Sequence, residues 1–273
     1  MTVDFHTHIF PEKIASKALQ SLKEGMKREQ GYCIEPCFDG TPEGLKRLLE
    51  ESGIDMAVTM PIATRVKSVD SINDFAKQIS CEKINSFATV HPLSENCTEQ
   101  LKKIAEAGFK GIKIHPEFQS FYIDSKESIN VIKTAEKLDL YVTVHAGEDI
   151  GMPPPVHCTP ERIKNVLSCV SGKNMIAAHL GGYKMWDDVE KYLVGTPIYM
   201  DTAFISRFID KEQCRRIITR HGSEKVLFGS DAPWENPADT LKFILSLGLS
   251  QDETENITHR NAERLLGTAS GKN

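Results

Sequence analysis

The chain has 273 residues and a formal net charge of −5; 40% of its residues are apolar and 26% are charged. The negative charge argues against nucleic acid or an anionic membrane as the main partner, because both are bound by basic surfaces. There is no run of about 18 apolar residues that could span a membrane, and the N-terminus lacks the basic and apolar regions of a secretion signal.

Seven cysteines are scattered along the chain, an odd number that suits a reducing cytoplasm. Cys33 and Cys37 lie four positions apart with no second pair nearby, so a structural zinc site is not expected there. We therefore expect a cytoplasmic protein with ordinary thiols, acting on a small molecule rather than on nucleic acid or a membrane.

Short β-rich segments alternate with amphipathic segments from one end of the chain to the other. Several β-rich segments are almost wholly apolar, as strands buried on both faces should be. We predict strands at Thr2–His8, Asp55–Pro61, Asn85–His91, Gly111–His115, Tyr141–His145, Asn174–His179, Ile198–Asp201 and Lys225–Gly229.

The segments between these strands predict helices. Thr41 is an N-cap residue with Pro42 at the first helical position, and Gly108 is a C-cap glycine. A last helix, Asp252–Leu266, is expected to pack outside. The other predicted helices are Pro42–Glu51, Val69–Ser80, Ser94–Ala107, Ser125–Leu138, Pro160–Cys169, Lys184–Leu193, Lys211–His221 and Pro237–Leu247.

Strict alternation of this kind implies parallel strands with crossover helices. In a chain of this length it favours a closed (β/α)8 barrel over an open doubly wound sheet, and we expect one domain over residues 1–273. Two long loops fall on the carboxyl face of the strands: Phe10–Gly40, with its own helix near Glu12–Glu29, and Ala146–Thr159. They act there as lids or are surface insertions.

His6 and His8 are the first residues that carry chemistry. Residues two apart in a strand point to the same side, so both imidazoles are expected to face the barrel interior near the end of the first strand. Two buried neutral imidazoles need a shared partner, and a divalent metal supplies one.

Three more residues that can bind a metal end later strands. His145 closes the fifth, His179 closes the sixth, and Asp231 follows the eighth. Each taken alone could be a satisfied core residue or a helix cap, and Pro233 makes the cap interpretation fair for Asp231. Their convergence at the carboxyl ends of strands, where barrel enzymes keep their catalytic groups, indicates a metal site.

The segments VDFHTHIF, VTVHAG, AAHLGG and FGSDAPW, with the closing HRNAERLLG, resemble the amidohydrolase superfamily, in particular its amidohydrolase-2 branch of hydrolases and related decarboxylases. The resemblance spans nearly the whole chain. It implies a (β/α)8 barrel with zinc or a similar divalent ion, and it makes His6, His8 and His145 metal ligands. It also matches His179 to the family's sixth-strand histidine and Asp231 to the aspartate after strand eight.

Three imidazoles and one carboxylate would leave a coordination position for water, as a catalytic zinc site requires. The metal would lower the pKa of that water to about 7, and Asp231 would accept its proton and pass it to the leaving group. His179 is expected to polarise the substrate or assist proton transfer, and to bind metal only in a binuclear site.

Lys113 and His115 face the same side of the fourth strand. Binuclear members of the superfamily bridge two metals with a carboxylated lysine or a glutamate from this strand. We favour one metal, with Lys113 and His115 as substrate-binding groups; the alternatives for Lys113 are a bridge between two metals or an internal ion pair with a barrel carboxylate.

Other residues near the expected face have weaker claims. Arg65 could clamp a substrate carboxylate or be a loop arginine, His91 ends the third strand, and Trp234 could form a pocket wall or pack in the core. Asp201 could orient His179 or be a cap, and His157 also has two interpretations. His221 and His259 have no expected catalytic role.

Three functions remain open. The leading one is metal-assisted hydrolysis of an amide, ester or lactone, and the second is non-oxidative decarboxylation of a small carboxylic acid on the same scaffold. The third is a metal-binding barrel without catalysis. Zinc is the expected metal, although manganese, iron or nickel suit the same ligands, and a homodimer is the default assembly.

Overall fold

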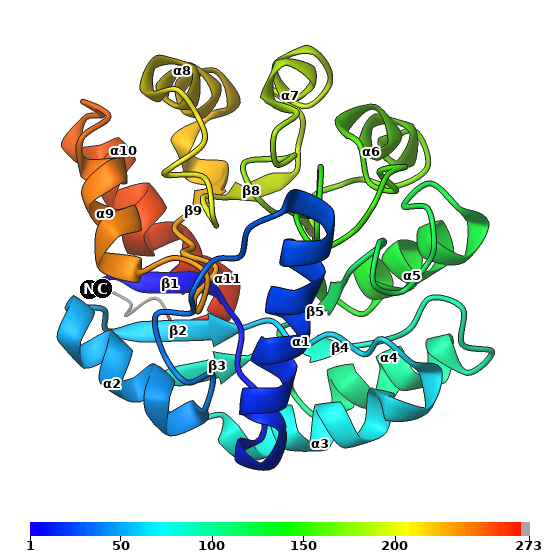
Figure 1. The fold of residues 1–273 in the computed structure, drawn as a ribbon. Helices are drawn as coiled ribbons and strands as arrows, with labels where there is room; N and C mark the ends of the chain where they lie inside the picture. Colours follow the sequence, from blue (N-terminus) through cyan, green and yellow to red (C-terminus); the bar gives the residue numbers. More distant parts are fainter. Residues whose placement is uncertain (269–273) are drawn as a thin grey trace.

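Parallel strands alternate with helices along the chain, as the sequence predicts (Figure 1). The structure, a computed structural model, describes residues 1–268; the predicted domain runs to 273, so its last five positions lie outside the described residues. The strands are β1 (Val3–Thr7), β2 (Met56–Thr59), β3 (Ile84–Ser86), β4 (Ala88–Thr89), β5 (Gly111–Ile114), β6 (Tyr141–Val144), β7 (Met175–Ala177), β8 (Tyr199–Asp201) and β9 (Val226–Leu227).

The helices form a ring outside the strands, except for α1, which lies in front of the strands, and α11, which lies behind them (Figure 1). Every predicted helix is present with its ends shifted by a few residues. They are α1 (Glu12–Gln30), α2 (Pro42–Ser52), α3 (Val69–Ile79), α4 (Cys97–Glu106), α5 (Lys126–Lys137), α6 (Pro160–Leu167), α7 (Trp186–Tyr192), α8 (Lys211–His221), α9 (Pro237–Leu245), α10 (Gln251–Glu255) and α11 (Asn261–Leu266), with 3-10 turns at Val66–Ser68 and Ser223–Lys225. The predicted last helix is α10 and α11, joined by a π-helical turn at Asn256–Arg260. The expectation that it packs outside is wrong for α11, whose Leu265 and Leu266 are buried against strand residues such as Val3 and Leu227.

The strands close into a barrel. Two parallel runs, β1-β2-β3 and β4-β5-β6-β7-β8-β9, are joined end to end at Phe87. The seam lies between β1 and the segment after β9, where Phe5 N donates to Phe228 O and His8 N donates to Ala232 O, each at 2.7 Å. The predicted (β/α)8 barrel is therefore confirmed, and the first and last strands are neighbours.

The third predicted strand is interrupted at Phe87. The part before it pairs with β2, and the part after it pairs with β5. Asn73 of α3 bonds both backbone groups of Thr89, accepting from its N–H and donating to its carbonyl. The backbone groups of Thr89 are thus satisfied by a side chain instead of by a neighbouring strand, and the pairing with β2 ends before this residue.

The observed helix caps show whether Asp231 is an N-cap residue, which the sequence left open. The Thr41 side chain accepts from Gly44 N, as predicted. Helix α9 is capped by Asn236, whose side chain accepts from Ala238 N. Asp231 is therefore not a helix cap, because that position belongs to a residue five further along, and its carboxylate is free for other contacts.

Helix α1 lies across the mouth of the barrel instead of joining the outer ring (Figure 1). Its apolar face, including Leu19 and Met26, is buried. Gly25 meets the loop after β6, and a Cβ there would lie 3.3 Å from the Gly151 carbonyl oxygen. The glycine lets the helix backbone approach this closely. Thus both long loops meet over the carboxyl ends of the strands. No helix in residues 1–268 has the length and apolarity needed to cross a membrane.

Candidate metal centre and substrate pocket

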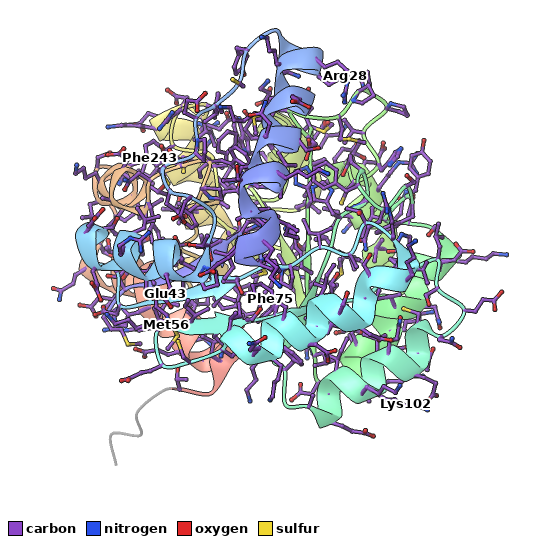
Figure 2. The ribbon with its side chains drawn as sticks, turned by 60° about the horizontal axis from the view of Figure 1, so that its bottom comes forward. Arg28, Glu43, Met56, Phe75, Lys102 and Phe243 are labelled. Atoms are coloured by element: carbon purple, nitrogen blue, oxygen red, sulfur yellow. The ribbon has the colours of Figure 1, made fainter. Side chains whose placement is uncertain are left out.

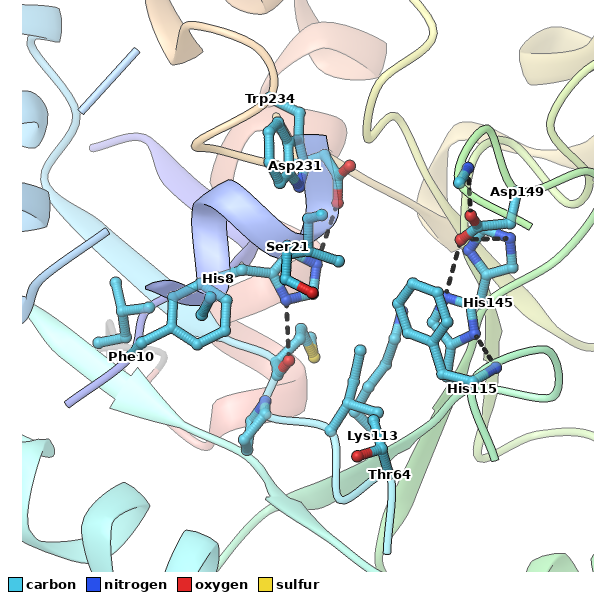
Figure 3. Close-up of a pocket in the computed structure, with 18 of the residues that line it drawn as sticks. His8, Phe10, Ser21, Thr64, Lys113, His115, His145, Asp149, Asp231 and Trp234 are labelled. Atoms are coloured by element: carbon cyan, nitrogen blue, oxygen red, sulfur yellow. Dashed lines mark hydrogen bonds and ion pairs between the residues drawn. The ribbon is translucent and has the colours of Figure 1, made fainter. Parts of the chain in front are cut away.

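One pocket of about 680 Å³ opens at the mouth of the barrel, beneath α1 (Figure 3). Its floor is formed by polar side chains at the carboxyl ends of the strands, and α1 and α3 supply much of its apolar wall. The residues proposed from the sequence that line it are His6, His8, Lys113, His115, His145, His179, Asp231 and Trp234.

Arg65 and His91 are not among the described residues that line this pocket. Arg65 is exposed just before the 3-10 turn Val66–Ser68, and His91 is buried with Leu93 N donating to its Nδ1. The Arg65 side chain is exposed and does not line the pocket, although its neighbours Thr64 and Ser68 do, so its role as a carboxylate clamp stays a prediction.

His6, His8 and Asp231 form a tight cluster across the barrel seam. Asp231 Oδ1 lies 3.1 Å from His8 Nε2 and 3.4 Å from His6 Nε2. The imidazole of His6 is fully buried, and that of His8 is partly buried. These three ligand atoms are close enough together to hold one metal ion.

The hydrogen bonds on the far side of each ring show that this cluster fits a cation. His6 Nδ1 donates to Asp201 Oδ2 at 2.8 Å, and His8 Nδ1 donates to Met60 O at 2.9 Å. Both partners can only accept, so each Nδ1 carries the proton and each neutral ring keeps a lone pair on Nε2. Both lone pairs then lie near the Asp231 carboxylate oxygen, and Lys113 Nζ also lies 3.2 Å from His6 Nε2. A divalent cation between the three ligand atoms would relieve the repulsion between these lone pairs and the carboxylate.

His145 and His179 make a second facing pair. His145 Nε2 donates to Glu148 O at 3.2 Å, and His179 Nδ1 donates to Ala203 O at 2.8 Å. The remaining nitrogens, His145 Nδ1 and His179 Nε2, lie 3.0 Å apart. This pair also needs a proton or cation between its atoms. It adjoins the first cluster, because the His179 and His6 ring centroids are 5.5 Å apart.

A third grouping, His115 with His145 and Asp149, is also compact enough for a cation (Figure 3). Its two imidazoles, however, are stacked with centroids 4.1 Å apart and planes 11° from parallel. The lone pairs of stacked rings run side by side and do not converge on one point. His145 Nε2 also already donates to Glu148 O, so we do not assign a metal to this grouping.

Lys113 lies beside the first cluster, with Nζ 3.2 Å from His6 Nε2. It is buried, and within residues 1–268 no ion pair joins it to a carboxylate. The internal ion pair considered for this lysine is therefore wrong. Burial lowers its pKa to about 8, so the side chain is a cation that can shed its proton at mildly alkaline pH.

Burial and neighbouring charges lower the pKa of three imidazoles of the site, those of His6, His115 and His145. Burial, followed by the charge of Lys113, lowers the pKa of His6 to about 4. Burial lowers the pKa of His115 and His145 well below the ordinary value. Burial alone would raise the pKa of Asp231, but its contacts with His8 and the other nearby histidines hold it well below its usual range. Neutral imidazoles beside an ionised carboxylate are the ligand forms that a metal requires.

The backbone is strained at two of these residues. His179 has φ of 59° and Asp231 has φ of 69°, in the left-handed region that non-glycine residues rarely adopt. At Asp231 the turn is held by its N–H donating to His6 O at 2.8 Å and its own carbonyl accepting from Trp234 N at 2.9 Å. Strain of this kind concentrates at functional sites, where surrounding bonds fix the side chain.

The Asp201 side chain contacts the ring of His6 and not, as expected, the ring of His179. Its side chain accepts from the His6 ring, and it meets His179 only through the backbone N–H, at 2.9 Å. It therefore orients His6 and not the His179 imidazole. His157 bonds Pro116 O and does not line the pocket, and His221 Nε2 bonds Ile198 O in the core.

Sequence reasoning missed several pocket residues. Asp149 lies 3.3 Å from His115 Nε2, and Glu148 stands at the rim with half of its side chain exposed. Both lie in the loop after β6 that the sequence marks as an active-site loop, so their acidic character was a usable signal. The apolar residues of α1 and α3 gave no comparable signal, because an apolar helical face usually packs in the core.

Parallel strands, a closed barrel and a histidine–carboxylate cluster at its mouth define a metal-binding (β/α)8 barrel. The chain belongs to the Amidohydrolase family, whose pattern it matches over residues 3–268. This is a family of metal-dependent enzymes, and the resemblance stated from the motifs is confirmed.

Several solved structures share the fold. A 5-carboxyvanillate decarboxylase from Sphingomonas paucimobilis has a TM-score of 0.72 and 16% identity, with 97% of this chain and 98% of that one covered. An IDCase from Metarhizium anisopliae in its apo form has a TM-score of 0.74 and 15% identity, covering 99% and 98%.

A dihydroxybenzoic acid decarboxylase from a Polaromonas species, solved with manganese and the inhibitor 2-nitroresorcinol, has a TM-score of 0.70 and 15% identity, covering 99% and 98%. At these identities the likeness establishes the fold. The sequence matches none of the curated proteins.

Proposed function

We propose that the protein is a metal-dependent, non-oxidative decarboxylase of a small carboxylic acid. The observation that carries this proposal is the contrast inside the pocket: one buried cation, Lys113, and a histidine–aspartate cluster lie beneath walls that are mostly apolar. Such walls disfavour a charged carboxylate relative to neutral carbon dioxide, while the floor holds the carboxylate in place. The fold neighbours named as decarboxylases agree with this choice.

In this proposal His6, His8 and Asp231 hold a divalent ion, with His145 Nδ1 as an adjoining ligand atom, and His179 is left free for proton transfer. When bound, the ion supplies Lewis acidity that polarises the substrate's oxygens. One ion is expected, and zinc or manganese suits these ligands. A single domain over residues 1–273 and a homodimer are parts of the same proposal.

The chain's own residues then position the acid and move one proton. Lys113 binds the carboxylate, and the pocket wall excludes water around it. The bond to the carboxylate carbon breaks, carbon dioxide leaves, and a proton takes its place on the substrate. His179 is the proposed proton donor: Ala203 O holds the proton on its Nδ1, and a second proton carried on its Nε2, which faces the pocket cluster, is the one that passes to the substrate carbon.

Hydrolysis is the second candidate, and one observation favours it. Asp231 is held ionised within 3.1 Å of His8, so it can accept a proton from an attacking water. Hydrolysis would release an acid without carbon dioxide, whereas decarboxylation consumes an acid and releases carbon dioxide.

The test uses protein reloaded separately with zinc and manganese. Aromatic and aliphatic carboxylic acids are assayed for headspace carbon dioxide, and matched esters, amides and lactones for acid release. We expect carbon dioxide from at least one acid, lost in His8→Ala and kept in His259→Ala, a histidine substitution outside the pocket. Acid release without carbon dioxide would replace the proposal with hydrolysis.

A further inference from the structure

The two ends of the pocket differ in chemistry. The ionisable groups gather at the strand ends, around His8, Lys113 and Asp231 (Figure 3). The opposite end lies between α1 and α3, where Figure 2 labels Phe75 below the N-terminal half of α1. The residues of α1 and α3 that line this end are mostly apolar: Ile14, Ala18, Leu22, Met26, Ile72 and Phe75, with Ser21 and Ser71 as the polar members.

The space exceeds what a small acid at the floor would use. A cavity of about 680 Å³ falls within the roughly 300–1,000 Å³ typical of pockets that enclose drug-sized ligands. Ile14 keeps half of its surface exposed although it lines the pocket, so this end of the cavity is left uncovered by the protein's own side chains. An apolar substrate group would bury this surface.

The charges that line the pocket disfavour a second anionic group at the end between α1 and α3. Among the described residues that line the pocket, Lys113 is the one lysine and no arginine is present. The nearest rim on the side of the β6 loop carries Glu148 and Asp149, which repel anions. A second carboxylate between α1 and α3 would lose its hydration without gaining a cationic partner.

We infer that the substrate is an elongated acid with one carboxylate, held at the strand ends, and an extended apolar group that lies between α1 and α3. This inference rests on the proposed function for its carboxylate end. Its apolar end is set by Ala18 and Leu22 on one side and Ile72 and Phe75 on the other, which makes these residues the determinants of substrate length.

The test is a binding series that needs no turnover. Benzenesulfonates with 4-alkyl groups from methyl to hexyl carry one anionic head and cannot lose carbon dioxide, and calorimetry on the metal-loaded protein gives each Kd. We expect Kd to fall about fourfold per methylene until the pocket is filled. A 4-carboxy analogue, with its second charge, is expected to bind at least tenfold more weakly than the 4-methyl compound.

Two substitutions locate the apolar group. Ala18→Trp fills the apolar end, so the dependence on chain length should vanish while unsubstituted benzenesulfonate binds as before. Ser16→Trp is the matched control, since Ser16 is exposed on the same helix and does not line the pocket. Ile72→Lys should reverse the preference and favour the 4-carboxy analogue, a gain that misfolding cannot produce.

The inference would be overturned if Kd did not change with alkyl length, or if Kd fell with alkyl length as steeply in Ala18→Trp as in the unsubstituted protein. The proposed reaction fails separately, because sulfonates report binding alone. A clear slope with no carbon dioxide from any acid overturns the decarboxylase and leaves the substrate shape standing. Carbon dioxide release together with a Kd that does not change with alkyl length overturns the inferred substrate shape and leaves the decarboxylase standing.

Discussion

Asp201 shows how one buried carboxylate fixes the chemistry of a neighbour. Its Oδ1 accepts from the backbone N–H of His179 and of Ala203, at 2.9 and 3.1 Å, which leaves Oδ2 for the His6 ring. Burial alone would raise its pKa, but its contact with the His6 ring lowers it to about 2. The proton on His6 Nδ1 is therefore fixed, and Nε2 is kept free as a ligand.

Asp201→Asn should reverse this arrangement. The two backbone N–H groups will keep the asparagine oxygen, so its NH2 group will face His6 Nδ1 and drive the ring proton to Nε2. We expect metal affinity to fall about 10–100-fold, as for other losses of a ligand's supporting carboxylate. Competition with a chelator measures it, and Asp74→Asn on the exposed face of α3 is the control. Unchanged affinity would mean that Asp201 does not set the His6 tautomer.

At the scale of elements, ion pairs on the outer ring join neighbouring helices. Glu190 of α7 accepts from Arg216 of α8 through both oxygens, at 2.6 and 2.8 Å, and from Arg220 at 3.3 Å. The Arg216 hydrogen bond, which is the largest cause, lowers the pKa of Glu190 to about 2. The helix pair is therefore held by a bidentate contact that two chain segments must bring together.

Glu190→Gln should lower the free energy of unfolding by roughly 1 kcal/mol at pH 7, a modest value because both arginines are half exposed. A lowered carboxyl pKa stabilises the fold above its ordinary value of 4.5, and this contribution is lost as pH falls toward 2. Urea unfolding of both proteins at pH 7 and pH 3 should show the difference narrowing. Glu106→Gln on α4 is the control. If the difference in unfolding free energy were as large at pH 3 as at pH 7, the ion pair of Glu190 would not be its cause.

The sequence predicts helix α1 and its place on the carboxyl face of the strands, but not which of its residues line the pocket. Its sequence predicts Glu12–Glu29, and the structure has Glu12–Gln30. Nothing in that local pattern says that its apolar face covers a pocket instead of a core. The break at Phe87 was missed for a similar reason, because it depends on Asn73 reaching Thr89 from another element.

At the scale of the whole molecule, the candidate metal ligands tie the two ends of the barrel together. His6 and His8 come from β1 and the residues after it, and Asp231 follows β9, where Thr7 pairs with Ala232 across the seam. A metal held here closes the ring of strands, because the unfolded chain keeps these ligands more than two hundred residues apart.

Adding metal should therefore raise the melting temperature. A metal at 100 times its Kd stabilises the folded state by about 2.7 kcal/mol. For a chain of this size that corresponds to a rise of roughly 5–10 °C in Tm. Calorimetry of protein treated with chelator, with and without added zinc or manganese, measures the shift, and His8→Ala should abolish it. Equal melting temperatures with and without metal would argue against a site at this seam.

The sequence by itself determined the fold class and the floor of the pocket. Strand periodicity and helix caps are local properties, and in a parallel barrel every strand's carboxyl end reaches the same mouth. His6, His8, Lys113, His179 and Asp231 could thus be placed together without coordinates.

Only the tertiary structure decided which of these atoms face one another. It brings His6, His8 and Asp231 into one cluster, pairs His145 with His179, and assigns Asp201 to His6. It also sets which residues of α1 line the pocket, and it leaves Arg65 outside the pocket lining. These facts depend on contacts between segments far apart in the chain, so no local pattern of residues contains them.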